Sequence, residues 1–434
     1  MEKSLNKTYL HTAIPASVEA MLLILLSAVD IAMIGHIDKV SLTAVAIFTQ
    51  PRLIILCFPK AMAVAVTARI SHLIGEDNES QVIPFFKQSL FAIGIVGIVL
   101  TLLSYIFLNE ILLVAGAKSD FINLSISYGR ICLVSIFINM FSLIIGAALT
   151  AILQTKYVLY AGVIGNIVNI ILNAIFIYGL GLGVVGAAIG TVIGSFVTLC
   201  ILLYLVVNNK SRLCIKGREN WKIEKSEVFI TMPMTIVTFM ELAFERIGMF
   251  LYTRLVMELG VTVFAAHTIA MNVCDFFYCF GQGFSKASLV LAGRAYAKKD
   301  EFLKKEIFSL SMKYNFFFGT IGCLIYLALK GIIPEIYSND VEVNFIAESI
   351  IVFVAFVSIP EMFNLTFSGI LRGTGQMKYV AKYSLISITI VRPIITYMLC
   401  FPLGLGVYGA WIALFIDQST RGTCAYLGAR YKFL

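Results

Sequence analysis

Long apolar stretches, separated by short polar connections, recur along almost the whole chain. Residues 90–107, 131–153 and 184–207 are examples, and each can cross the roughly 30 Å hydrocarbon core of a bilayer as an α-helix. The pattern therefore predicts an all-α membrane protein with about twelve spanning helices. These predicted helices cover residues 12–35, 43–71, 84–108, 122–153, 157–179, 184–207, 228–258, 262–293, 308–330, 343–371, 379–400 and 405–429.

The two halves of this helix series repeat each other. Lys156-Tyr157-Val158 recurs as Lys378-Tyr379-Val380, and the motif Gly-Leu-Gly-Val-x-Gly-Ala at 181–187 recurs at 404–410, both at an offset of about 222 residues. Matches in register predict two six-helix bundles of the same orientation, related by pseudo-two-fold symmetry along the membrane normal. Alternatively, the repeated glycines only allow helices to approach closely.

One long polar segment separates the halves. We assign residues 1–207 to an N-lobe, 208–227 to a cytoplasmic connector and 228–434 to a C-lobe. No polar stretch of similar length occurs between the other predicted helices, so this connector divides the chain into two six-helix halves.

Composition and charge agree with this picture. Hydrophobic residues make up 59% of the chain, charged residues 13%, and the mean hydropathy is +0.92, which excludes a water-soluble globule. The formal charge of +8 does not indicate nucleic-acid binding, because the basic residues fall mainly in alternate loops. By the positive-inside rule, both termini are expected on the cytoplasmic side. The protein itself is expected in the plasma or inner membrane of the cell. The basic positions on that side are Lys3, Lys7, Lys156, the segments 210–225 and 294–305, Arg372, Lys378, Lys382, Arg430 and Lys432.

Four polar residues of the first half stand out within predicted spans. Asp30 lies deep in the first helix with no basic residue within a turn, so its charge requires a bound cation or a retained proton. Asn169 and Asn173 share one helix face, and Thr191 follows in the next helix. Together they offer an all-oxygen set suited to Na+, for which Asp30, Asn169 and Asn173 are the metal ligands. Alternatively, the two asparagines are interhelical hydrogen-bond links.

The second half carries acids in its predicted spans. Glu241 and Glu245 are four residues apart, and Glu361 follows a proline in a later helix. Because Glu241 has no basic residue four positions away, we interpret it as an unpaired acid that faces a cavity. Asp417 and Arg421 are spaced as a structural ion pair.

With these residues in place, the chain resembles the multidrug and toxic compound extrusion (MATE) family from about Ala13 to Ala425. The resemblance rests on six short segments. None of them is specific to the family alone, but their order across the two six-helix halves is specific. The segments are the Pro15 region with Val-Asp30-Ile-Ala-Met-Ile-Gly35, the stretch 161–179 containing Asn169 and Asn173, Gly183 to Thr191, Pro233 followed by Glu241, Ala-Ala-His267, and Gly369-Ile-Leu-Arg372-Gly373-Thr-Gly375.

The resemblance implies residue roles. The positions that match the family's N-lobe cation site are Asp30, Asn169, Asn173 and Thr191. Glu241 matches the family's helix-7 acid, and Glu361 falls where the NorM-like branch usually has an aspartate; Glu245 is a further substrate or coupling candidate. Acids in both lobes place the chain nearer the NorM-like than the DinF-like branch.

The function that the resemblance implies is antiport: inward flow of Na+ or H+ drives export of amphipathic organic cations by alternating access. No cofactor beyond the coupling ion is expected, and we expect a monomer in the bilayer. A lipid-linked-precursor flippase of the related superfamily is the alternative, which Arg246 and Arg392 keep open. An enzyme is not expected, because the four histidines are far apart and no nucleophile motif occurs.

Overall fold

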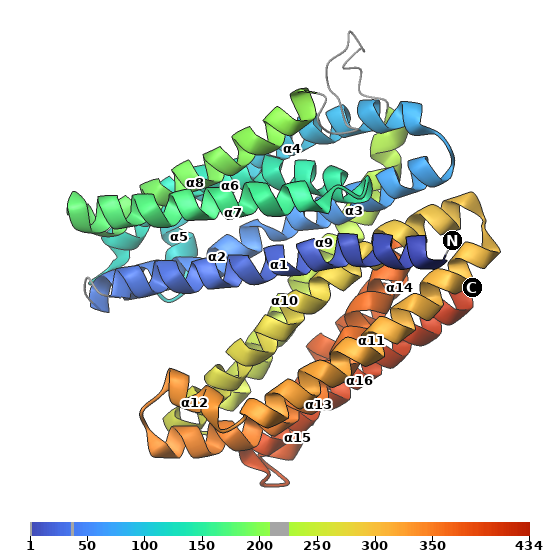
Figure 1. Ribbon diagram of the computed structural model, residues 1–434. Coiled ribbons are helices and arrows are strands. Elements are labelled where there is room, and N and C mark those ends of the chain that lie inside the picture. Colours follow the sequence, from blue (N-terminus) through green and yellow to red (C-terminus); the bar gives the residue numbers. More distant parts are fainter. Residues whose placement is uncertain (1, 36–38, 209–224) are drawn as a thin grey trace. The chain divides into compact units, whose positions relative to one another are not determined.

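The computed structural model describes residues 2–35, 39–208 and 225–434, and the regular structure in these ranges is helical (Figure 1). This confirms the predicted all-α class. Most of the expected connector 208–227 lies outside the described residues. The helices of the first half are α1 (Glu2–Gly35), α2 (Lys39–Ile55), α3 (Cys57–Gly75), η1 (Glu79–Gln81), α4 (Val82–Ile106), α5 (Leu108–Val114), α6 (Ile122–Ala151), α7 (Thr155–Ala174), the π-helical η2 (Ile175–Gly179) and α8 (Gly183–Val207).

The second half follows the same plan. Its helices are α9 (Lys225–Met257), α10 (Val261–Lys298), α11 (Glu301–Leu329), α12 (Ile332–Tyr337), α13 (Val341–Gly373), α14 (Met377–Ser384), the π-helical η3 (Leu385–Val391), α15 (Arg392–Cys400) and α16 (Gly406–Lys432).

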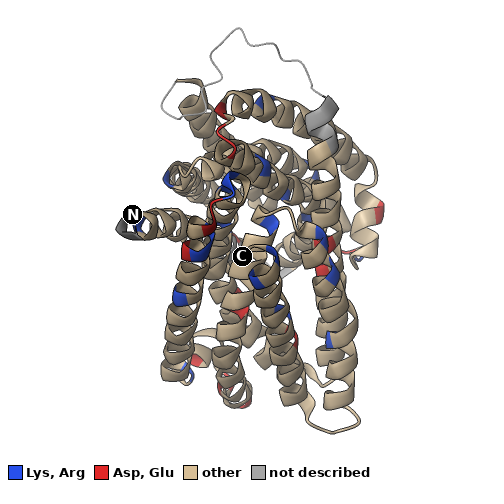
Figure 2. Cartoon of the chain, turned by 90° about the vertical axis from the view of Figure 1, so that its right-hand side faces the viewer, with Lys and Arg blue, Asp and Glu red and all other residues tan. Residues whose placement is uncertain are grey.

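Ten stretches of the described residues are long and apolar enough to span a membrane. α9 and α16 also have spanning length, but charged side chains such as Glu241 and Asp417 make them more polar. With these two helices, the chain has the twelve spans predicted from the sequence, in two bundles. Figure 2 shows how sparse the charged positions are along the helices.

The helix boundaries differ from the prediction mainly at the second span. The expected helix 43–71 is divided at Leu56 into α2 and α3. Pro59 explains the break, because it has no N–H to donate to the carbonyl of Ile55, where α2 ends. The short helices α5 and α12, between longer ones, were not predicted.

By their contacts, the residues form two compact units whose boundaries lie inside helices. One unit contains residues Val18–Phe239, and the other contains Met1–Ser17 together with Met240–Leu434. Each boundary therefore falls in the first helix of a half, α1 or α9. The two boundaries are separated by the repeat offset of about 222 residues.

Each unit is built around one central helix. In the unit of residues 18–239, α6 packs against α2, α3, α4, α5, α7 and α8, and its end, from Ile144 to Ala151, is buried throughout. In the other unit, α13 packs against α10, α11, α12, α14 and α16. These two helices occupy the same place in the order of spans, the fourth of each half.

The repeated glycine motif has the same backbone conformation in both halves. Gly181 and Gly404 have φ of +66° and +65°, a region that favours glycine. The later glycines Gly186 and Gly409 pack so closely that an added Cβ would lie 2.9 Å from the carbonyl oxygens of Phe176 and Leu399, respectively. Close helix approach alone does not explain the motif, because its first glycine is required by the turn.

Candidate functional site

Asp30 of α1 meets Asn173 of α7 in the core of the first unit. Asn173 is fully buried, and its Nδ2 donates a hydrogen bond to Asp30 Oδ1 over 2.8 Å. Asp30 itself is half-buried. A hydrogen bond to a carboxylate is stronger than one between neutral groups, so it positions both side chains.

Asn169, one turn earlier on α7, contacts the same carboxylate. With its amide nitrogen directed at Asp30, the nitrogen lies 3.1 Å from Oδ1, and the amide oxygen accepts hydrogen bonds from Oγ1 and the backbone N–H of Thr191 over 3.3 and 3.1 Å. The structure thus brings together the four predicted residues, from α1, α7 and α8. The bonds between α1 and α7 are interhelical, as the alternative interpretation expected.

One atom of this cluster distinguishes an ion site from simple helix linkage. Asn173 Oδ1 is buried and accepts no hydrogen bond from the described residues. Leaving a buried carbonyl oxygen without a partner costs about 1–3 kcal/mol. This oxygen, the Asp30 carboxylate and the Asn169 and Thr191 oxygens are the hard donors that a monovalent cation requires, so the residues fit Na+.

Two glycines of α8 allow the asparagines to approach. An added Cβ on Gly190 would lie 2.1 Å from Asn173 Oδ1, and one on Gly194 would lie 2.7 Å from Asn169 Cβ. The sequence interpretation missed these residues. Their four-residue spacing with Gly186 is the pattern of small residues that lets helices pack closely, and it could have revealed them.

Arg52 is a further residue that the sequence interpretation missed. It lies on α2, half-buried, and interacts electrostatically with Asp30. The prediction that Asp30 has no basic partner was therefore incomplete, because it considered only residues within one turn of α1. A nearby guanidinium reduces the charge that a bound cation has to balance.

In the second unit, the interpretation of Glu241 as an unpaired acid is wrong. Its Oε1 lies 2.6 Å from Nη2 of Arg372 on α13, and the Glu241 side chain is only 5% exposed. The partner is 131 residues away in sequence, so inspection of neighbouring turns could not find it. Glu241 is one half of a buried ion pair.

The expected pair of Asp417 with Arg421 is confirmed, at 3.1 Å. Arg392 also contacts the Asp417 carboxylate, and Ser387 donates a hydrogen bond to it over 2.6 Å. Two arginines and a hydroxyl satisfy this buried acid, which supports a structural role. Arg392 therefore has an internal counter-charge, and it no longer supports the alternative of a lipid-linked-precursor flippase.

Glu361 differs from the other buried acids of this unit. It is 2% exposed, one carboxylate oxygen lies 4.0 Å from Cys274 Sγ, and the other has no hydrogen-bond partner among the described residues. Within the part of the chain that the structure describes, no basic side chain lies at ion-pair distance from it. Glu245 is partly exposed. Glu361 interacts electrostatically with Arg421 and Arg392 but forms no direct ion pair with either, so it replaces Glu241 as the buried acid of this unit without an ion-pair partner among the described residues.

Known proteins resemble this chain over nearly its whole length. The sequence model of the MatE family matches residues 15–175 and, a second time, residues 238–398. A probable multidrug resistance protein NorM of Thermotoga maritima is 24% identical over 433 residues, covering 98% of this chain and 92% of that protein. Multidrug and toxin extrusion protein 1 of Mus musculus is 25% identical over 435 residues, covering 94% and 72%.

The fold agrees with these matches. The solved structure of a multidrug resistance MATE family transporter of the MOP superfamily, in an outward-facing conformation, aligns with a TM-score of 0.93 at 19% identity, covering 99% of this chain and 96% of that one. The NorM relative is consistent with the expected NorM-like character. Because the family match recurs in both halves, each time on the helices that form the repeat, the chain belongs to the MatE family of membrane transporters.

Proposed function

We propose that this protein is a cation-coupled antiporter that exports amphipathic organic cations by alternating access. The observation that carries this proposal is the cluster of Asp30, Asn169, Asn173 and Thr191, in which the Asn173 amide nitrogen contacts the carboxylate and the Asn173 oxygen is buried against Gly190 without a hydrogen-bond partner among the described residues. A carboxylate within a spanning helix that forms no direct ion pair, as is the case for Asp30 among the described residues, indicates a functional site. Binding and release of a cation is the task for which these donors are suited.

Na+ is the coupling ion that the donor types favour. Rotation of the two carboxamides would turn their oxygens toward an ion held by Asp30, while Thr191 adds a hydroxyl oxygen. These neutral oxygens replace water around a metal ion but add little to holding a proton. Protonation of Asp30 neutralises the same carboxylate, so H+ competes with Na+ and drives weaker transport in acid.

The substrate class rests on the relatives. The NorM relative is named a probable multidrug resistance protein, and the Mus musculus relative is named a multidrug and toxin extrusion protein. By this similarity we assign multidrug export to the present chain, with Glu361 as a second coupling or substrate-binding acid and with Glu241 and Glu245 of α9 as further candidates. The proposal places the protein in the cell membrane as a monomer with both termini in the cytoplasm.

Dye efflux from proteoliposomes tests the proposal. Wild-type protein should export a cationic dye when an inward Na+ gradient is imposed at neutral pH, and an inward proton gradient should drive slower export at acidic pH. Asp30→Asn should remain folded but lose efflux under either gradient. Gradient-driven efflux by this variant at the wild-type rate would refute the coupling role of Asp30.

A further inference from the structure

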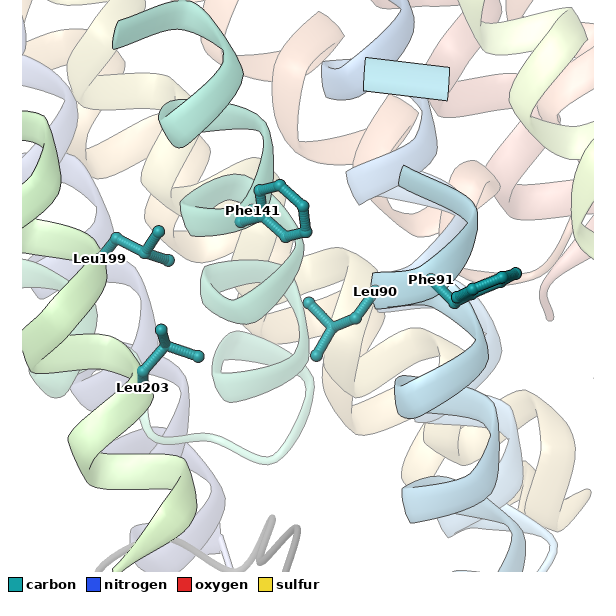
Figure 3. Close-up of a pocket in the computed structure, with 5 residues that line it drawn as sticks. All are labelled: Leu90, Phe91, Phe141, Leu199 and Leu203. Atoms are coloured by element: carbon teal, nitrogen blue, oxygen red, sulfur yellow. The ribbon is translucent and has the colours of Figure 1, made fainter. Parts of the chain in front are cut away.

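A surface pocket and a buried arginine both lie outside the proposed cation site. The pocket is in the first unit, between α4, α6 and α8 (Figure 3), and the residues that line it are all apolar: Leu90, Phe91, Phe141, Leu199 and Leu203. Without a polar lining group, this pocket selects no ligand by its chemistry. The arginine is Arg392 of α15 in the second unit, which is only 2% exposed and contacts polar side chains.

The repeat relates this arginine to the cation cluster of the first unit. Gly186 of the repeated glycine motif packs against Phe176, and its counterpart Gly409 packs against Leu399. Phe176 and Leu399 are separated by the same number of residues as the two glycines. The contacts between the paired helices are therefore repeated in the same register as the sequence motif.

The same offset assigns counterparts to two residues at the centre of the cluster. Arg392 corresponds to Asn169, and Asp417 corresponds to Gly194. In the first unit, an added Cβ on Gly194 would lie 2.7 Å from Asn169 Cβ. In the second unit, Arg392 forms an ion pair with Asp417. Corresponding positions are thus neighbours in both units, and the arginine lies where the first unit has a proposed ligand of the cation.

Two further positions of the cluster have counterparts beside the arginine. Tyr252 of α9 follows Asp30 by the number of residues that separates the two unit boundaries, and the Arg392 Cζ lies 5.6 Å from the centre of its ring. The face of an aromatic ring attracts a cation. Thr396 corresponds to Asn173. It is fully buried, and its Oγ1, like Asn173 Oδ1, has no hydrogen-bond partner among the described residues.

We propose that Arg392 is a built-in cation: its guanidinium holds, in the second unit, the place that the coupling ion takes in the first. Asp417 and the Tyr252 ring balance its charge, and its Nη1 donates a hydrogen bond to Met249 Sδ over 2.8 Å. The inference rests on the proposed cation site, because it extends that site through the repeat. It follows that the native second unit binds no mobile cation at this place, and that removal of the guanidinium uncovers a latent Na+ site.

The groups around the arginine suit Na+ once the guanidinium is removed. Asp417 provides a carboxylate, Ser387 donates a hydrogen bond to it over 2.6 Å, and Thr396 adds a buried hydroxyl one turn after the arginine. The counterpart of Thr191 is the apolar Leu414, so Ser387 supplies the second hydroxyl oxygen here. Carboxylate and hydroxyl oxygens are hard donors of the kind that bind Na+.

Removal of the guanidinium also leaves the acids of this unit short of positive charge. Asp417 keeps Arg421 at 3.1 Å. Glu361 interacts electrostatically with Arg421 and Arg392, so it loses one of these two partners. The remaining negative charge attracts a cation, but Arg421 competes with it for Asp417. Na+ should therefore bind the latent site more weakly than the site at Asp30.

Thermal unfolding of the purified full-length protein in NaCl and in choline chloride, at equal ionic strength, tests the inference. The variants are compared in the Asp30→Asn background, which removes the site of the first unit. Arg392→Asn introduces the residue type of the first unit, and Arg392→Gln keeps more of the volume of the arginine. With Na+ about tenfold above its dissociation constant, the Tm of each should rise by about 1–2 °C more than that of Asp30→Asn alone.

Two controls separate the loss of this charge from other effects. Arg392→Lys keeps a cation at the same place, and Arg254→Gln removes an exposed arginine in the last turn of α9. Neither should add a Na+-dependent rise, and an added rise in at least one neutral variant of Arg392 alone supports the inference. An equal rise in either control would overturn it. So would the absence of an added rise in both neutral variants, or their failure to fold in NaCl, because Na+ would then not replace the guanidinium.

The proposed cation site of the first unit is tested separately, in the wild-type protein. Na+ should raise the wild-type Tm, and Asp30→Asn should remove this rise. A wild type whose Tm ignores Na+ would count against the proposed Na+ site, whatever the Arg392 variants show.

Discussion

Gly190→Ala should disrupt the cation cluster without altering any proposed ligand. The added Cβ would lie 2.1 Å from Asn173 Oδ1, about 1.3 Å closer than the 3.4 Å at which ordinary van der Waals contact begins. The Asn173 backbone nitrogen is also tight, at 3.2 Å, so the carboxamide has to swing away. Its 2.8 Å hydrogen bond to Asp30 is then lost, and its oxygen no longer reaches an ion held there. The loss of one such interaction with a charge is worth about 1.5–3 kcal/mol, or roughly 10- to 100-fold in Na+ affinity.

Isothermal titration of the purified protein with NaCl, at constant ionic strength in choline chloride, measures this affinity. Gly162→Ala on α7 is the control, because an added Cβ there meets nothing within 4 Å. Both variants replace a helical glycine by alanine, so they share the same gain in helix propensity. Wild-type Na+ affinity in Gly190→Ala, or an equal loss in Gly162→Ala, would refute the proposed role of Asn173.

Three further outcomes are expected. Asn173→Ala should raise the Na+ concentration needed for half-maximal efflux and leave proton-driven efflux largely intact. Equal loss of both activities would favour the alternative that the asparagines only form interhelical hydrogen bonds. Glu241→Ala should lower the free energy of unfolding by about 3–5 kcal/mol, because it strands Arg372, and Glu241→Ala/Arg372→Met should recover most of that loss, as denaturant titration would show. Glu361→Gln creates no unpaired cation, so it should lower the free energy of unfolding by less than Glu241→Ala does. It should slow the efflux of cationic dyes more than that of neutral dyes; equal slowing would indicate a packing role.

The features that the sequence revealed are those encoded locally or by repetition. Apolar runs located the twelve spans, and the offset of about 222 residues located the repeat. Asn169 and Asn173 could be assigned to one face because a helix places residues four apart side by side. Asp417 and Arg421 were paired for the same reason, and the structure confirms the contact.

The features that were missed arise from packing between helices distant in sequence. Arg372 finds Glu241 across 131 residues, and Arg52 approaches Asp30 from another helix. No periodicity within one helix carries this information. The division of the second span at Leu56 is a different case. Pro59 is a local signal for a helix break, but the length and hydropathy of the stretch 43–71 favoured one continuous helix.

The membership of residues 1–17 in the unit of the second half has a consequence for the order of folding. Tyr9 is fully buried and its hydroxyl lies 2.7 Å from Ser288 Oγ, while Ser17 donates a hydrogen bond to the carbonyl of Phe280. These partners are synthesised 279 and 263 residues later. The beginning of α1 therefore enters the membrane long before its native contacts exist, and closure of this long loop belongs to the late steps of assembly. During synthesis, lipid or the insertion machinery has to shield the segment in the meantime.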